Sequence, residues 1–119
     1  MQKEQQSMAH DPKALLLDII TACNHIMAFT EGFSFEDFTD DALVKSAVNM
    51  QFIVIGEALM RTRNIENDFY ANISDADRIV AFRHIIAHGY DVIVDEIVWE
   101  VVRDKIPQLL EEATALLNA

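Results

Sequence analysis

The chain is poor in residues that break helices or cross-link loops, with three Gly, two Pro and one Cys among 119 residues. The single cysteine, Cys23, excludes an internal disulfide, and we expect a reduced, cytoplasmic protein. No run reaches the ~20 consecutive apolar residues of a transmembrane helix, so we expect no membrane association. Since Gly and Pro supply most turns, their scarcity predicts a few long elements.

Basic side chains are also scarce. Nine Lys and Arg stand against 20 Asp and Glu, which gives a formal net charge of -11. This balance argues against a protein that coats nucleic acid with a broad basic face. It does not exclude an enzyme that binds one or two phosphates locally.

The length and the apolar content, 51% of the residues, fit one soluble globular domain. Residues 1–11 are polar and mixed in charge, and we expect a flexible N-terminal arm there. Residues 12–119 then form a single helical domain.

Apolar residues recur at steps of three and four along most of this domain, which is typical of amphipathic helices. Capping and breaking residues divide the pattern. The predicted helices are 12–30 with Asp11 as N-cap, 41–61 capped by Thr39 or Asp40, 75–87 capped by Ser74, and 96–117, opened by Asp95 and kinked or split by Pro107. We expect 33–39 to be a loop or single turn whose Phe rings enter the core, and 61–73 to be a loop with room for one helical turn. The fold class predicted is all-α, an up-down bundle of four to five helices.

The second predicted helix is apolar on two sides. One stripe contains Leu43, Ala47, Met50, Val54 and Ala58, and Val48, Phe52, Ile55 and Leu59 lie beside it. A helix with so wide an apolar arc is often buried both in its own core and against a partner, which predicts a partner surface on this helix. Gly56 lies within this helix. Close approach of another helix would explain it, and a tolerated glycine fits equally well.

The segment Arg83-His84-Ile85-Ile86-Ala87-His88-Gly89-Tyr90-Asp91 gathers the side chains suited to chemistry. Arg83 and His88 diverge by about 140° on a regular helix, whereas His84 and His88 share a face. A site that uses both Arg83 and His88 therefore requires unwinding near Gly89 or a second copy of the segment.

These groups suit cleavage of an RNA phosphodiester without a metal or other cofactor. Because an imidazole gives and takes protons near neutral pH, His88 is the candidate for proton transfer. Arg83 is the candidate for binding the phosphate and its developing negative charge. His84 is an auxiliary candidate that positions the RNA backbone or transfers the second proton.

Arg83-x4-His88 followed by Tyr90 resembles the R-x4-H-x-Y form of HepT-like proteins. Ile55-Gly56-Glu57-Ala58 looks like their I-G-E-A helix signature, and the run from Val94 to Val102 is similar to their segment after the motif. In this order, over about 15–117, the signatures resemble the HepT-like ribonuclease toxins of the HEPN superfamily. The resemblance implies a helical bundle that dimerises, so that two R-x4-H motifs meet in one cleft and cut RNA.

The resemblance also implies a toxin–antitoxin pair of a type VII-like kind. The antitoxin is expected to be a minimal nucleotidyltransferase, of the MNT type, that transfers AMP to Tyr90. The added phosphate and bulk, two residues from His88, would repel and block RNA.

Other interpretations of the same residues stay open. His84 and His88 with Asp91 could be zinc ligands in a metal-bound helical sensor. Arg83 could form a surface salt bridge, and Tyr90 could be a packing residue. Glu57 either orients Arg83 as an ion-pair partner or is a solvated or structural helix residue. The rival function is a non-catalytic helical accessory that binds and positions a nucleotidyltransferase.

Overall fold

A computed structural model describes residues 11–65, 68–88 and 94–119, and the predicted N-terminal arm lies outside these residues except for Asp11. Most of the described residues are helical and none of them lies in a strand, which confirms the all-α class. In chain order the elements are α2 (Pro12–Phe29), α3 (Phe35–Asp40), α4 (Ala42–Asn64), the 3-10 turn η1 (Tyr70–Asn72), α5 (Ala76–His88), α6 (Asp95–Glu100), the π-helical segment η2 (Val101–Lys105) and α7 (Ile106–Asn118).

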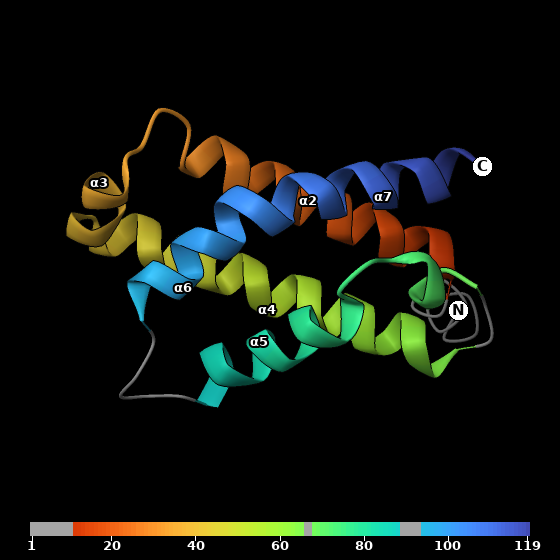
Figure 1. The fold of residues 1–119 in the computed structure, drawn as a ribbon. Helices are drawn as coiled ribbons and strands as arrows, with labels where there is room; N and C mark the ends of the chain where they lie inside the picture. Colours follow the sequence, from red (N-terminus) through yellow and green to blue (C-terminus); the bar gives the residue numbers. More distant parts are fainter. Residues whose placement is uncertain (1–10, 66–67, 89–93) are drawn as a thin grey trace, which may run out of the picture.

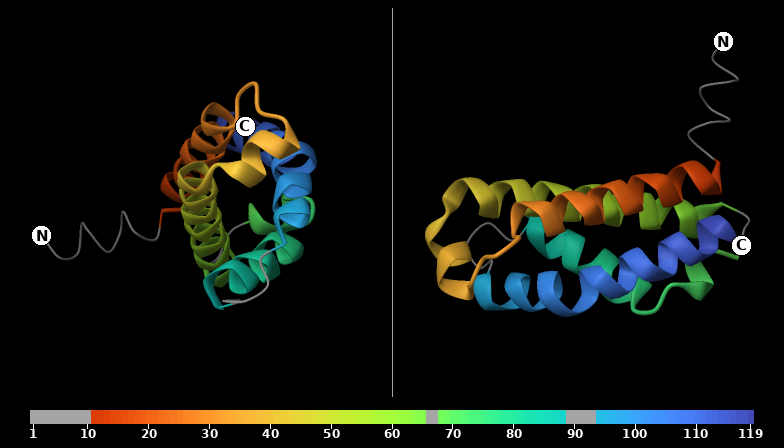
Figure 2. Two further views of the ribbon diagram at one scale, coloured as in Figure 1. Left: turned by 90° about the vertical axis from the view of Figure 1, so that its left-hand side faces the viewer. Right: turned by 90° about the horizontal axis from the view of Figure 1, so that it is seen from above.

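The long elements alternate in direction, as expected for an up-down bundle (Figure 1). α2 and α5 run one way, whereas α4 and the continuous rod α6–η2–α7 run the other way. α4 is the central helix, because it packs against both α2 and α5, and α7 covers the remaining side of α2. Two further views show these rods side by side around a common interior, with α3 closing one end (Figure 2).

The core is formed by the inward faces of these rods. The largest side chains that are fully buried are Phe38, Phe52, Leu16, Ile19, Ile26, Ile55, Leu59, Ile106 and Leu109. Two aromatic pairs join distant segments. Phe52 of α4 meets Phe82 of α5 edge to face at 5.1 Å between centroids, and Phe38 lies 5.1 Å from Trp99. Burial of each large core side chain stabilises the fold by about 1.5–3 kcal/mol. The Phe52–Phe82 contact therefore fixes how α5 packs on α4.

The start of α2 follows the sequence prediction. Asp11 caps the helix by accepting a hydrogen bond from the Lys13 backbone at 3.0 Å, and Pro12 occupies its first turn. Gly32, just beyond the end of α2, adopts a φ of +76°, a conformation that side-chain-bearing residues rarely take.

The connection from α2 to α4 differs from the prediction of a loop. Ser34 and Asp37 form a reciprocal capping box that starts the short helix α3, with bonds of 3.1 and 3.0 Å. Of the Phe residues in this segment only Phe38 is fully buried. Because Asp40 ends α3, the cap of α4 passes to Asp41, which accepts from the Val44 backbone at 3.0 Å. The expected caps, Thr39 and Asp40, were wrong.

α5 begins at Ala76, and Ser74 does not act as its cap. Glu112 of α7 accepts hydrogen bonds from the Ser74 backbone at 3.0 Å and from its hydroxyl at 2.6 Å. Asp75, at a φ of +61°, binds Lys105 of η2 at 2.8 Å. The hydrogen bond from the Lys105 ammonium holds the pKa of the Asp75 carboxyl below its usual value. The beginning of α5 is thus tied to the rod η2–α7.

The last predicted helix is interrupted, as the position of Pro107 indicated. The irregular segment is η2, however, and Pro107 lies in the first turn of α7. Proline lacks an N–H donor, and its ring conflicts with the carbonyl four residues earlier, here that of Arg103. The wider π-helical turn accommodates the proline upstream of its own position.

α4 is long and apolar enough, with a mean hydropathy of 1.3 over its best window, to pass a composition test for a membrane-spanning helix. A third of that window is buried inside the bundle. Core helices of soluble proteins pass the same test, and Val48, Phe52, Ile55 and Leu59 of α4 are core residues. The core face of α4 therefore supplies only part of its hydropathy, and exposed apolar residues of its outer face, such as Leu43 and Met50, supply the rest.

Candidate active site

Arg83 lies in the seam between α5 and α4, with only 15% of its side chain exposed. Its aliphatic stem lies against Gly56, where the absence of a side chain lets α5 approach closely. One guanidinium nitrogen, Nη2, donates to Oε1 of Glu57. The salt bridge that the alternative interpretation expected is therefore present, although it is partly buried, and the binding of phosphate by Arg83 stays a prediction.

The other terminal nitrogen of Arg83, Nη1, lies 3.2 Å from Nδ1 of His84. When Arg83 donates this bond, Nδ1 accepts, and the ring proton of a neutral His84 then resides on Nε2. The His84 ring stacks on that of His88, with centroids 6.3 Å apart and planes inclined by 18°. A continuous series of contacts therefore runs from Glu57 through Arg83 and His84 to His88.

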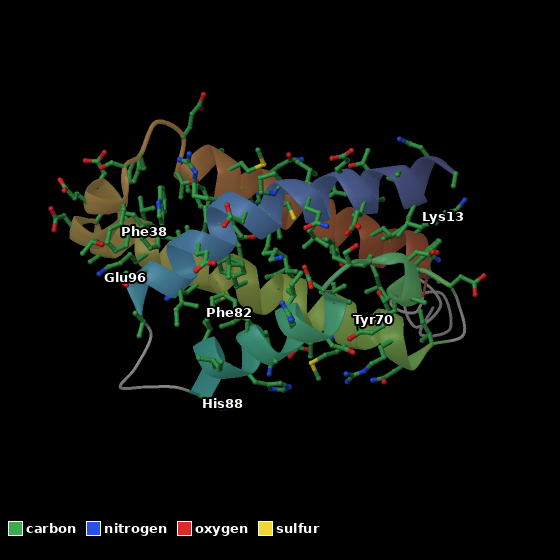
Figure 3. The ribbon with its side chains drawn as sticks, in the orientation of Figure 1. Lys13, Phe38, Tyr70, Phe82, His88 and Glu96 are labelled. Atoms are coloured by element: carbon green, nitrogen blue, oxygen red, sulfur yellow. The ribbon has the colours of Figure 1, made fainter. Side chains whose placement is uncertain are left out.

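His84 and His88 are exposed, and Figure 3 shows His88 at the end of α5, on the side of the molecule away from α2 and α7. The spacing argument separated Arg83 from His88, and among the described residues Arg83 contacts Glu57 and His84 and forms no hydrogen bond with His88. The sequence did not indicate that His84 would connect them. The cluster presents two imidazoles to solvent and holds a guanidinium behind them.

Glu57 is the acidic member of this cluster. Its side chain is 42% exposed, so it is neither fully solvated nor fully buried, and it forms the ion pair with Arg83. Its neighbour on α4, Arg61, lies one turn further along and is exposed. The predicted contact between Glu57 and Arg83 is present, and its part in catalysis stays a prediction.

Three residues named from the sequence, Gly89, Tyr90 and Asp91, lie outside the described residues. The modification site at Tyr90 and a zinc site that includes Asp91 therefore stay predictions. Within residues 11–65, 68–88 and 94–119, no group of three or more His, Cys, Asp or Glu side chains gathers as a metal site.

The ties that fix the start of α5 were missed by sequence reasoning. Ser74 is 38 residues from Glu112, and Asp75 is 30 residues from Lys105. Pairs so distant in sequence leave no periodic or capping signal. They matter for the site because α5 carries Arg83, His84 and His88.

Comparison with known proteins identifies the family to which the chain belongs. A sequence model of the family described as "Ribonuclease HepT-like" matches residues 19–116, most of the chain. The chain therefore belongs to the HepT-like family of HEPN-type ribonucleases.

Individual relatives agree with the family match. A protein of Methanocaldococcus jannaschii whose name proposes an RNase is 30% identical over 104 residues, covering 86% of this chain and 93% of the relative. A protein of Caldanaerobacter subterraneus, similarly named, is 28% identical and covers 90% of this chain and 95% of the relative. A Thermococcus cleftensis protein named as a probable ribonuclease HepT is 32% identical, covering 86% and 92%. No solved structure matches the chain significantly.

Proposed function

We propose that this chain is a metal-independent endoribonuclease that works as a homodimer and serves as the toxin of a toxin–antitoxin pair. The observation that carries the proposal is the contact series Glu57–Arg83–His84–His88, in which a mostly buried, oriented guanidinium backs two exposed imidazoles. Family membership supplies the class of reaction, and the cluster supplies the groups for its steps.

In the proposed reaction the ribose 2'-hydroxyl attacks the adjacent phosphorus. The imidazole of His88 takes the hydroxyl proton, and the bond from phosphorus to the 5'-oxygen breaks. A second imidazole, His84 or one from the other copy, gives a proton to that leaving oxygen. The products are a 2',3'-cyclic phosphate and a 5'-hydroxyl end. Acid–base help of this kind is typically worth ~10²–10⁴-fold in rate.

Arg83 stabilises the negative charge that builds on the phosphorane oxygens. A guanidinium already held by Glu57 needs little reorganisation when that charge develops, which makes its stabilisation effective. Its low exposure, 15%, also places it where water competes less with phosphate. In this role Glu57 is an orienting residue and does not touch the RNA.

The homodimer is supported by the outer face of α4. Along this face Leu43 is 81% exposed, Met50 56% and Val54 37%, whereas Ala58, which the sequence placed in the same stripe, belongs to the core at 4%. The spacing of Leu43, Ala47, Met50 and Val54 continues by three residues to Glu57. A second copy seated on this apolar stripe would therefore lie next to the residue that holds Arg83, and the two clusters would share one crevice.

The regulatory part of the proposal is that a minimal nucleotidyltransferase of the MNT type transfers AMP to Tyr90. Its chemical support is the position of Tyr90 two residues after the exposed His88. An adenylyl group there adds negative charge and bulk at the place where RNA phosphate must bind.

Expression in cells and cleavage in vitro test the activity. Wild type is expected to arrest growth and to cut single-stranded RNA equally well in EDTA, leaving cyclic phosphate ends. Arg83→Ala and His88→Ala are expected to lose both effects. Matched controls are Arg103→Ala, on η2, and His25→Ala, exposed on α2, and both should retain activity.

The rival function, a non-catalytic accessory that positions a nucleotidyltransferase, gives a different result. It predicts that wild type and the double variant Arg83→Ala, His88→Ala behave alike in cells and that neither cuts RNA. That outcome would replace the ribonuclease proposal. Relief of wild-type toxicity by a nucleotidyltransferase, lost in Tyr90→Phe, would support the regulatory part.

A further inference from the structure

Gly56 lies in the middle of α4, is buried, and faces α5. A Cβ atom placed on it would overlap Cβ and Cγ of Arg83 and would lie 3.2 Å from Cδ of the same residue. The three atoms nearest to that position all belong to Arg83. The space that glycine leaves empty is therefore filled by the stem of one residue, the guanidinium carrier of the candidate site.

The overlap involves atoms that cannot all move aside. Cγ and Cδ of Arg83 change position when the side chain adopts another rotamer, but Cβ is attached directly to the backbone of α5. A methyl group at position 56 therefore requires α5 to move away from α4. Such a movement is opposed by the Phe52–Phe82 contact and by the ties of Asp75 and Ser74 at the start of α5.

The residue after Gly56 holds the other end of the same side chain. Glu57 accepts from Nη2 of Arg83, and Nη1 meets His84 at 3.2 Å. The Nε atom is buried and has no partner among the described residues. How closely the aliphatic part of the Arg83 side chain packs on α4 therefore decides whether the guanidinium reaches Glu57 and His84 together.

We propose that Gly56 is a positioning residue of the active site: its missing side chain sets the depth at which Arg83 lies on α4, and so places the guanidinium between Glu57 and His84. This inference rests on the proposed ribonuclease function for its catalytic consequence. Its structural part, the dependence of the position of Arg83 on residue 56, stands independently of that function.

Gly56→Ala is a sharp test because the loss of stability that we expect is opposite to the gain that helix propensity alone would give. Alanine is the better helix former, so propensity alone would raise the melting temperature. We expect Gly56→Ala instead to lower the melting temperature and to lower kcat for RNA at least tenfold, with KM changed less than threefold. A misplaced guanidinium loses contacts to the phosphorane more than contacts to the bound substrate.

The position of Arg83 is read directly by NMR. The buried Nε–H of Arg83 is expected to give a separate resonance, identified by its absence in Arg83→Lys, and Gly56→Ala should shift or broaden it. The control is Val48→Ile, which adds a methyl group to another buried residue of α4, two turns away. It should leave the Nε resonance at its wild-type position. It should also keep kcat within twofold of the wild-type value.

An unchanged Nε resonance together with kcat within twofold in Gly56→Ala would overturn the proposal. If wild type cuts no RNA, the ribonuclease function fails, and the NMR comparison alone still decides on Gly56. If Gly56→Ala does not fold, Gly56→Ala with Arg83→Gly decides: recovered folding identifies the Arg83 stem as the cause, and a double variant that stays unfolded refutes it.

Discussion

Replacing Glu57 with glutamine removes the charge that holds Arg83 while it keeps the size of the side chain. The ion pair is intermediate between an exposed and a buried pair, since the side chain of Arg83 is 15% exposed and that of Glu57 is 42% exposed. Exposed pairs contribute about 0–1 kcal/mol, and loss of one partner from a fully buried pair costs about 3–5 kcal/mol. Water reaches Glu57, and glutamine keeps a neutral acceptor, so the cost should lie between these two ranges. We expect the free energy of unfolding to fall by about 1–2 kcal/mol.

Urea unfolding followed by circular dichroism measures this loss. The midpoint should fall while the m-value stays constant, because the surface exposed on unfolding is unchanged. In a domain of this size about 1–2 kcal/mol corresponds to roughly 4–8 °C in melting temperature. RNA cleavage, measured where the variant is fully folded, should fall about tenfold, the equivalent of about 1.4 kcal/mol in the transition state.

The matched control is Glu111→Gln, at an exposed position of α7. It removes the same charge from the chain but not from the cluster. If Glu57→Gln and Glu111→Gln have the same stability and the same cleavage rate, Arg83 is held by its other contacts. The reasoning that Glu57 orients the guanidinium would then be refuted.

The remaining predictions concern the partner surface, the core and the tie at the start of α5. Met50→Glu should yield a folded monomer by light scattering, and it should not cleave RNA. The control Leu17→Glu, at an exposed position of α2, should remain dimeric. A dimeric Met50→Glu would exclude the outer face of α4 as the dimer interface. Burial raises the pKa of the Cys23 thiol to about 12, so it should react with a disulfide reagent at pH 8 only after unfolding, and rapid reaction of the native protein would contradict its placement. The Lys105 ammonium lowers the pKa of Asp75 in the folded state. The Asp75–Lys105 ion pair therefore stabilises the fold above about pH 4, and this stabilisation is lost as the pH falls through the lowered pKa of Asp75. Asp75→Asn should therefore unfold more easily than wild type at pH 7 and similarly to it near pH 2, and an equal difference at both pH values would show that the ion pair is not responsible.

The parts of the fold that were predictable are those specified by neighbouring residues. Asp11 and Pro12 define the start of α2 locally, and the three- and four-residue steps of α4 define a helix wherever it packs. The cap of α4 was not predictable, because Thr39, Asp40 and Asp41 are all suitable. The choice depends on α3, which forms around the burial of Phe38 and so uses Asp40 as its last residue.

The candidate site divides in the same way. Helical spacing predicted that His84 and His88 share a face and that Arg83 and His88 do not pair. The glycine in α4 suggested a close approach without identifying the residue that approaches. That identity depends on the register between α4 and α5, which is set by Phe52, Phe82 and the distant ties of Asp75. No local pattern in the sequence specifies this register.

A net charge of -11 is compatible with RNA cleavage because the chemistry needs few phosphate contacts. Fixed charges act over about 8 Å at physiological salt, so acidic side chains far from the cluster affect it little. Of the two arginines that end α4, Arg61 lies one turn beyond Glu57, whereas Arg63 lies over the Tyr70 ring. For a single strand each neutralised phosphate contributes about -0.7 to the slope of log affinity against log salt. A dimer that binds two phosphates should therefore show a shallow slope of about -1.4, and a steep slope would mean that a broad basic surface, which this chain lacks, binds the RNA.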